Sequence, residues 1–157
     1  MGYTHYWYRP RILDATRFRD FRIDLEKVVR GSGIPLDNSA LTDEGVMIDG
    51  RGEPFVIDQC FAGRIRQGNA NRCFAFCKTQ HLPYDALVTA ALMLAKIHFG
   101  DAFDASSDGN EDPTSFDNGK ALIKDILGLD VRTSFKEVVH EGDDFPSISL
   151  VVEYVKA

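Results

Sequence analysis

The sequence predicts an α+β protein with a single mixed sheet, a buried central helix and two further helices. Residues 86–99 are apolar on nearly every side, which is typical of a helix enclosed by the rest of a protein. Short stretches that alternate apolar and polar residues lie before and after this segment, as expected for strands. A chain of 157 residues corresponds to one domain, 1–157, which can bury enough surface to fold without disulfides or metal ions.

Charge, hydrophobicity and cysteine content indicate which kinds of partner and which cellular compartment to expect. The formal net charge of -6 argues against a large basic surface, so we expect no direct contact with nucleic acid. Residues 86–99 are too few to span a membrane, and the amino terminus lacks the pattern of a secretory signal. The three cysteines, an odd number in a domain that needs no disulfides, favour a reducing compartment. We therefore expect a cytoplasmic protein without a membrane partner.

Residues 3–9 predict the first strand. They are rich in aromatic side chains, which favour strands, and Pro10 closes the segment. We interpret it as a central strand packed on both faces. The alternative is that His5 or Tyr6 lines a pocket.

Residues 14–30 predict the first helix. Asp14 is a favourable N-cap residue, and Gly31 with Gly33 provides a stop at the other end. Apolar residues recur between them at helical spacing and form a stripe for burial, namely Phe18, Phe21, Leu25, Val28 and Val29.

Two hairpins are predicted next. Residues 46–49 and 55–58 form one, around the glycine-rich turn between them. Residues 59–66 and 72–78 form a second candidate hairpin. The strand 72–78 carries apolar side chains on both faces, which is typical of an interior strand.

The central helix is expected over residues 83–99. Pro83 suits the first helical position, and Gly100 ends the helix. A short strand over 103–107 follows, and then a third helix over 115–127, with Ser115 or Asp112 as its N-cap.

The last part of the chain is less clearly patterned. Residues 131–140 alternate as a strand does, yet Ser134 and Glu137 have the spacing of a capping box, so a short helix is the alternative. Residues 147–154 alternate regularly and predict a terminal strand.

The chain order strand, helix, strand from 72 to 107 indicates a parallel crossover. The carboxyl ends of the two strands then lie at one edge of the sheet, where open α/β sheets bind ligands. The helix that begins at Pro83 points its free N–H groups to the same edge, which favours anions. This placement predicts a site for a small anionic, nucleotide-like ligand. The candidate ligand-binding residues are Lys78, Thr79, Tyr84, Ser107, Asp108 and His5.

The same residues also have plainer interpretations. Lys78 can simply end a strand in solvent, Asp108 can serve only as a turn residue, and Asp85 can be an acid that the helix dipole favours. No phosphate-binding glycine motif supports the nucleotide hypothesis.

Cysteine chemistry has little support. Cys77 with His81, His98 or His5 would make a catalytic pair, but an apolar strand face indicates a core residue. Cys73 lies about 13 Å from Cys77 on an extended strand, too far for a disulfide or a shared zinc site. We expect neither a metal nor a cofactor.

Three segments carry a resemblance to other proteins. They are GYTHYW at Gly2–Trp7, FCKT at Phe76–Thr79 followed by Pro83–Tyr84–Asp85, and SSDG at Ser106–Gly109. With these, about the first three quarters of the chain resembles a group of small bacteriophage, prophage and bacterial proteins without an established activity. The resemblance implies a mobile-element protein of the host cytoplasm that acts against a host defence system.

Three functions are compatible with these observations. The first is a non-enzymatic binding protein that engages a host macromolecule, such as a host protein, or sequesters the small anionic ligand. The second is a small enzyme for a nucleotide-like substrate, in which Lys78 stabilises charge and Asp108 or Cys77 reacts. The third is a structural or assembly component.

Overall fold

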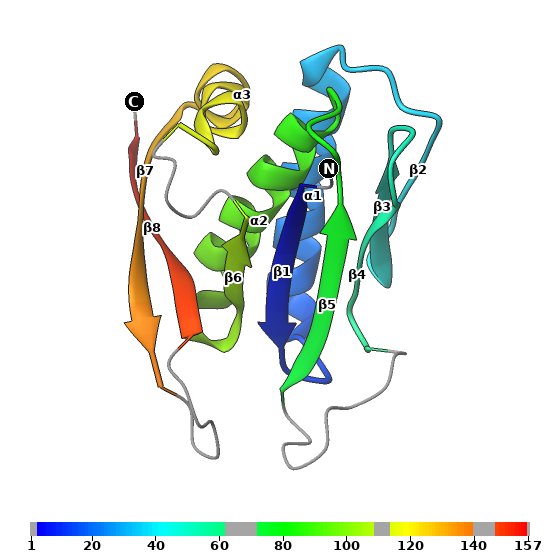
Figure 1. Ribbon diagram of the computed structural model, residues 1–157. Coiled ribbons are helices and arrows are strands. Elements are labelled where there is room, and N and C mark those ends of the chain that lie inside the picture. The colour runs from blue at the N-terminus through cyan, green and yellow to red at the C-terminus, as the bar shows by residue number, and fades with distance from the viewer. Residues whose placement is uncertain (1–2, 62–71, 109–113, 140–146, 157) are drawn as a thin grey trace.

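The computed structural model describes residues 3–61, 72–108, 114–139 and 147–156, and within them it has an α+β fold, as predicted (Figure 1). The elements in chain order are β1 (Thr4–Arg9), α1 (Ala15–Ser32), β2 (Asn38–Leu41), β3 (Gly45–Asp49), β4 (Phe55–Asp58), β5 (Cys73–Lys78), α2 (Asp85–Phe99), the 3-10 helix η1 (Gly100–Ala102), β6 (Asp104–Ser107), α3 (Asp117–Leu127), β7 (Leu129–Val138) and β8 (Ser147–Lys156).

The strands form three small sheets, so the prediction of a single sheet is wrong. The strand orders are β5-β1-β6, β2-β3-β4 and β7-β8. One reason is the partner of β5: among the described residues, β5 pairs along its whole length with β1. In the described part of the segment just before β5, Cys60 forms an isolated bridge with Ile12. The rest of the second predicted hairpin, from residue 62, lies outside the described residues.

The central sheet confirms the predicted parallel crossover. β1 lies between β5 and β6 and is antiparallel to both, so β5 and β6 run parallel to each other, with α2 connecting them. The start of β1 therefore lies at the same edge as the ends of β5 and β6. This arrangement brings Tyr3 and His5 close to Thr79 and Ser107.

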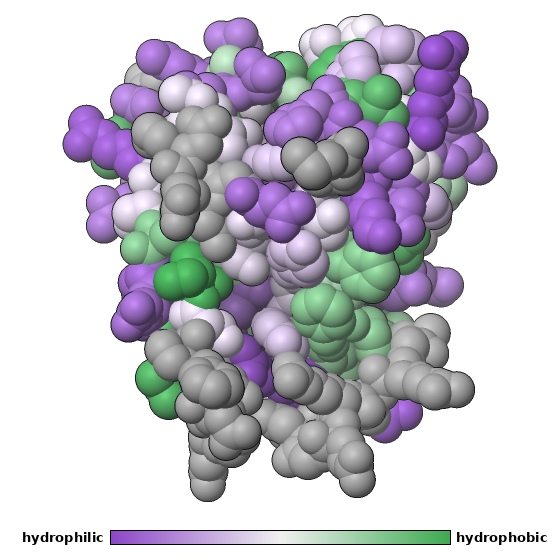
Figure 2. All heavy atoms as spheres, in the orientation of Figure 1, coloured by the Kyte–Doolittle hydropathy of each residue, from purple (hydrophilic) through white to green (hydrophobic). Residues whose placement is uncertain are grey.

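Helices α1 and α2 cover one side of the central sheet, and no described helix covers the opposite side, the open side (Figure 1). All residues of α2 from Leu87 to Ala95 are buried, which confirms the enclosed central helix. On the open side, Phe74 is 37% exposed and Phe76 is 48% exposed. Figure 2 shows apolar side chains over β5 on this side. The prediction that 72–78 is an interior strand packed on both faces is therefore wrong.

β1 is central, as predicted, but its two faces differ. His5, Trp7 and Arg9 face the helices and are fully buried. Tyr6 and Tyr8 lie on the open face, where they are half-buried beside Phe74. The expectation of complete packing on both faces is wrong for this reason.

The remaining boundaries differ little from those predicted. α2 begins at Asp85 rather than Pro83, and α3 begins at Asp117 with Phe116, not Ser115, at its N-cap position. Residues 129–138 form strand β7, paired throughout with β8, which resolves the ambiguity between strand and helix. None of the helices in the described residues is both long enough and apolar enough to cross a membrane.

Candidate functional site

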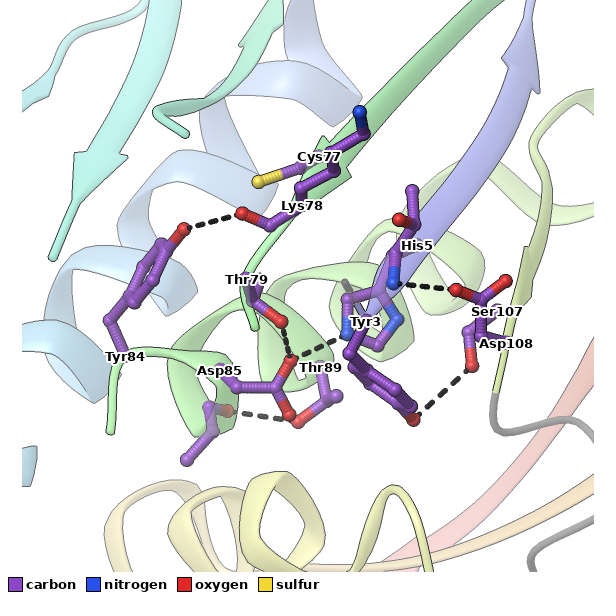
Figure 3. Close-up of polar contacts among 12 residues, drawn as sticks. Tyr3, His5, Cys77, Lys78, Thr79, Tyr84, Asp85, Thr89, Ser107 and Asp108 are labelled. Atoms are coloured by element: carbon purple, nitrogen blue, oxygen red, sulfur yellow. Dashed lines mark hydrogen bonds and ion pairs between the residues drawn. The ribbon is translucent and has the colours of Figure 1, made fainter. Parts of the chain in front are cut away.

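A partly exposed carboxylate forms the centre of the candidate site. Asp85 is the first residue of α2, and its Oδ1 accepts hydrogen bonds from His5 Nε2 at 2.6 Å and from Thr79 Oγ1 at 2.5 Å (Figure 3). His5 and Thr79 are fully buried, whereas the Asp85 side chain is 17% exposed. Because two donors from β1 and the end of β5 hold one oxygen, the orientation of this carboxylate is fixed.

The turn between β5 and α2 positions these groups. The backbone N–H groups of Thr79 and Gln80 both donate to the carbonyl of Tyr3, at 2.9 and 3.3 Å, and so tie the end of β5 to the start of β1. Gln80 and His81 then adopt φ angles of 55° and 58°. This left-handed conformation is uncommon for residues other than glycine, and such strain is concentrated at functional sites.

A pocket of about 290 Å³ opens beside Asp85. Tyr3, His81 and Asp85 line one side of it, and Ser115 and Asn118, near the start of α3, line the other. The rings of Tyr3 and His81 are in contact and tilted, with their centroids 3.9 Å apart and an interplanar angle of 34°. The pocket therefore combines an aromatic wall with one fixed hydrogen-bond acceptor.

The residues at the end of β6 join the strands at this edge. Ser107 is buried, and its hydroxyl lies 3.5 Å from that of Tyr3. Asp108 accepts hydrogen bonds from the backbone N–H of Thr4 and from the Tyr6 hydroxyl, each at 3.0 Å. Burial, together with this contact to Asp108, raises the pKa of Tyr6. The described contacts of Asp108 are thus structural.

The side chains of two predicted site residues, Lys78 and Tyr84, make their described contacts elsewhere than at Asp85. Lys78 is exposed on the open face of the sheet, with its Nζ 5.9 Å from the ring centroid of Phe76. Tyr84 is buried, and its hydroxyl donates to the backbone carbonyls of Glu53 and Lys78 at 2.8 and 3.2 Å. Burial raises the pKa of Tyr84. A Cβ at Gly52 would collide with this tyrosine, which explains the glycine there.

None of the residues that line this pocket was among the predicted site residues, although His5 and Thr79 contact Asp85 from behind it. Asp85 was interpreted only as an acid near a helix start, Tyr3 as part of a strand, and His81 as a partner of Cys77. One signal was present in the sequence: Asp85 is the only charged residue between Pro83 and Ala95 in a segment that is otherwise almost entirely apolar. Of its two donors, Thr79 lies 6 residues earlier in the chain, whereas His5 lies 80 residues earlier, and this second contact has no local sequence pattern.

The structure does not support Cys77 as a nucleophile. Its thiol is buried and donates to the carbonyl of Glu53 at 3.3 Å. Burial raises the pKa of this thiol to about 12, so the reactive thiolate is scarce at neutral pH. His98, one of its suggested partners, lies instead 2.8 Å from Asp24. Across the part of the chain that the structure describes, no group of three or more His, Cys, Asp or Glu residues could hold a metal ion.

Comparison with known proteins identifies no relative of this chain. No protein-family model, curated protein or solved structure matches the chain. What the site can bind or do therefore follows from its own residues and their geometry.

Proposed function

We propose that this protein is a binding protein that sequesters a small, nucleoside-like ligand in the pocket beside Asp85. The observation that carries the proposal is the Asp85 carboxylate, which lies at the pocket wall with its Oδ1 held by both His5 and Thr79. Such an arrangement presents a preoriented acceptor to a ligand. The resemblance to phage and prophage proteins supports a role in withholding the ligand from a host system.

The fixed carboxylate selects the polar groups of the ligand. Its Oδ1 already accepts two hydrogen bonds inside the protein, so a ligand that reaches Asp85 must supply further N–H or O–H donors. Charge-assisted hydrogen bonds to a carboxylate are roughly twice as strong as neutral ones. The amino and ring N–H groups of a nucleobase meet this requirement, and so do the hydroxyls of a ribose.

The size of the pocket and its aromatic wall support a ligand with one planar ring. A volume of about 290 Å³ lies near the lower end of the roughly 300–1,000 Å³ typical of ligand pockets. Tyr3 and His81 supply ring faces, on which planar bases stack favourably. A single nucleoside matches this volume better than a dinucleotide.

The charges at the pocket favour the neutral part of a nucleotide. None of the described lining residues is a lysine or arginine, and Lys78 lies on the other face of the sheet. Asp85 also occupies the first turn of α2, where an anion would otherwise benefit from the helix dipole. We therefore propose a ligand bound through its base or sugar rather than through phosphate.

The test is isothermal titration calorimetry with a panel of the four ribonucleosides. We expect saturable binding of at least one of them, and a loss of about tenfold or more in affinity for Asp85→Asn, because the amide loses the charge and one acceptor. Asp24→Asn is the matched control. It alters a second carboxylate that contacts a histidine, between α1 and α2 and outside the pocket, and should leave the affinity unchanged.

Two results would contradict the proposal. One is the absence of binding by all four nucleosides at millimolar concentration. The other is equal affinity for wild type and Asp85→Asn. Circular dichroism of both variants checks that each carboxylate change leaves the fold intact.

The contact between His5 and Asp85 also favours a second candidate, an enzyme that uses the same pocket. Asp85 is the partly exposed member of the pair, so it would contact the substrate as a general base, while buried His5 would only position it. Chromatography of each bound nucleoside after prolonged incubation distinguishes the two functions. Unchanged ligand supports sequestration, and a new product that Asp85→Asn does not form supports catalysis.

A further inference from the structure

Aromatic side chains gather on the open side of the central sheet (Figure 2). Phe74 and Phe76 on β5 are 37% and 48% exposed, and Tyr6 on β1 is half-buried beside them. In the register of the two strands, Tyr6 lies directly opposite Phe76. These three rings form a surface that is defined here as the aromatic platform. A contiguous group of exposed apolar side chains marks a site of interaction.

The rings of the aromatic platform are oriented alike. The centroids of Tyr6 and Phe74 are 6.2 Å apart with an interplanar angle of 24°, and those of Phe74 and Phe76 are 6.0 Å apart with an angle of 33°. The hydroxyl of Tyr6 donates to Asp108 at 3.0 Å, which holds this ring in place. Rings fixed side by side on a sheet offer successive surfaces on which planar groups stack.

Two cationic side chains flank the aromatic platform along β5. The Arg72 guanidinium lies 4.0 Å from the ring centroid of Tyr8, which itself contacts Phe74. At the other end, Lys78 Nζ lies 5.9 Å from the ring centroid of Phe76. Lys78 forms no ion pair with any described residue. A line of rings with a cation at each end is complementary to planar bases joined by phosphates.

The carboxylates near the aromatic platform already accept hydrogen bonds within the protein. On the β6 side, Asp108 accepts the two bonds described above, and Asp104 accepts one from the Ser149 hydroxyl at 3.0 Å. Near the end of β5, the Glu53 carboxylate accepts from the backbone N–H of Lys78 at 2.9 Å. Because two of these three carboxylates lie on the β6 side, phosphates are better accommodated along β5.

We propose that the aromatic platform binds single-stranded nucleic acid. Bases stack on the rings of Phe76, Phe74 and Tyr6, and the phosphates follow β5 past Lys78. Neighbouring rings on β5 are 6.0 Å apart, whereas successive nucleotides in a duplex strand are about 3.4 Å apart. One base on each ring therefore requires a strand whose bases are unstacked. Since every base has a ring face, such binding tolerates different sequences.

The net charge of -6, from which no contact with nucleic acid was expected, excludes only a large basic surface. On the aromatic platform, stacking supplies most of the affinity, and only Arg72 and Lys78 lie near the phosphates. Each phosphate contact contributes about -0.7 to the slope of log affinity against log salt concentration for single strands. Two contacts predict a shallow slope of about -1.4.

The test is fluorescence anisotropy with a labelled DNA strand of twelve nucleotides and mixed sequence, alone and annealed to its complement. We expect saturable binding of the single strand and at least about tenfold weaker binding of the duplex, whose bases are stacked on one another. An RNA strand of the same sequence should bind within a few-fold of the DNA strand, because stacking does not involve the 2′-hydroxyl.

Two exposed aromatic residues give a matched pair of variants. Phe76 belongs to the aromatic platform, whereas Tyr154, 51% exposed, lies on β8 in another sheet. Phe76→Ser should weaken binding of the single strand about tenfold, and Tyr154→Ser should leave it within about twofold. Lys78→Gln should make the salt dependence shallower by about 0.7. All three side chains are exposed, so the variants should fold.

The outcomes separate the alternatives. No binding of the single strand at millimolar protein, or equal binding of strand and duplex, would overturn the proposal. Equal losses for Phe76→Ser and Tyr154→Ser would show nonspecific adhesion and also overturn it. Sedimentation that shows a dimer lost only in Phe76→Ser, with strand binding unchanged, would assign the aromatic platform to a second copy of the chain instead.

The pocket beside Asp85 is tested separately. Asp85→Asn should leave the affinity for the single strand unchanged, because Asp85 lies outside the aromatic platform. A loss of strand binding in this variant would assign that binding to the pocket and overturn the role of the aromatic platform. Nucleoside binding is measured without any strand, so either proposal can fail while the other holds.

Discussion

Two pairs of histidine and aspartate show how the surroundings of a carboxylate decide its role. The distances are similar, 2.6 Å between His5 and Asp85 and 2.8 Å between His98 and Asp24. Asp24 and His98 connect α1 to α2, two helices that pack together. Asp85 instead lies at the wall of a pocket beside the rings of Tyr3 and His81. The pair of His5 and Asp85 is therefore the one that we propose to serve a ligand, whereas the pair of His98 and Asp24 connects two packed helices.

The three cysteines also differ in their surroundings, and their reactivity can be predicted from their burial. Cys60 is exposed, whereas Cys73 and Cys77 are buried. Since burial raises the pKa of Cys77 to about 12, its thiolate fraction at pH 8 is on the order of one in ten thousand. Iodoacetamide at pH 8 should therefore modify Cys60 in the native protein, and all three cysteines only after denaturation. Peptide mass spectrometry identifies the modified residues, and native labelling of Cys77 as fast as Cys60 would contradict this expectation.

Among the elements, the helices were predicted well because their signals are local. The apolar stripe and Asp14 predict α1, and the Asp14 side chain does accept a hydrogen bond from the Arg17 N–H. Strand pairing is not local. β5 pairs with β1, about seventy residues earlier in the chain, and no short-range pattern indicates this partner.

The candidate site was predicted only in part for a related reason. Alternation along β5 correctly groups Lys78 with Phe74 and Phe76 on one face. It does not tell which face meets the helices, because both faces are apolar. The helices cover the face of Cys73 and Cys77, and Lys78 is consequently exposed. The edge of the sheet was therefore identified correctly, whereas the central residue of the pocket, Asp85, was not among the residues predicted to bind ligand.

The packing of α3 on α2 leads to a prediction about one glycine. A Cβ at Gly119 would lie 2.8 Å from the backbone nitrogen of Ala90 and 2.9 Å from Cε of Met93. Alanine favours a helix over glycine by about 1 kcal/mol, but backbone atoms cannot yield to this contact. Gly119→Ala should therefore lower the free energy of unfolding, by roughly 1–3 kcal/mol. Urea denaturation followed by Trp7 fluorescence measures it.

Gly31 provides the control for this prediction. It lies in α1, and a Cβ there would meet only the end of the Ile126 side chain, at 3.0 Å. Because a side chain can move, Gly31→Ala should be neutral or should stabilise the protein by up to about 1 kcal/mol. Equal effects of the two substitutions would show that the contact of Gly119 with the α2 backbone is not the deciding factor.

At the scale of the whole molecule, the three sheets place two concave sites on different sides of one core. The pocket beside Asp85 depends on the edge at which β1, β5 and β6 meet the start of α2. A groove of about 230 Å³ between β4 and β5 depends instead on the separation of these two strands, which belong to different sheets. Trp7 and Cys77 both belong to the core beneath these sites. The stability of that core should therefore depend on the protonation of its buried acidic groups.

That dependence predicts a loss of stability at alkaline pH. In the folded protein the pKa of Cys77 is about 12, against an ordinary value of 9.0, and burial also raises the pKa of Tyr84 above 10.0. Both groups lose their protons more readily in the unfolded chain, so the folded state holds more protons. The free energy of unfolding should fall as pH rises from about 9 towards 12, by up to about 1.4 kcal/mol per unit for each group.

The contribution of the thiol can be separated by its pH range. From pH 9 to pH 10 the unfolded thiol goes from about half to mostly ionised, while the unfolded tyrosine is at most about half ionised. Cys77→Ala lowers stability at every pH by leaving a small cavity, but it should make the slope between pH 9 and 10 shallower than in wild type. Urea titrations at pH 7, 9, 9.5 and 10, followed by Trp7 fluorescence, measure both slopes. Parallel curves for the two proteins would show that Cys77 ionises as readily in the folded core as in the unfolded chain, against its burial beneath β5.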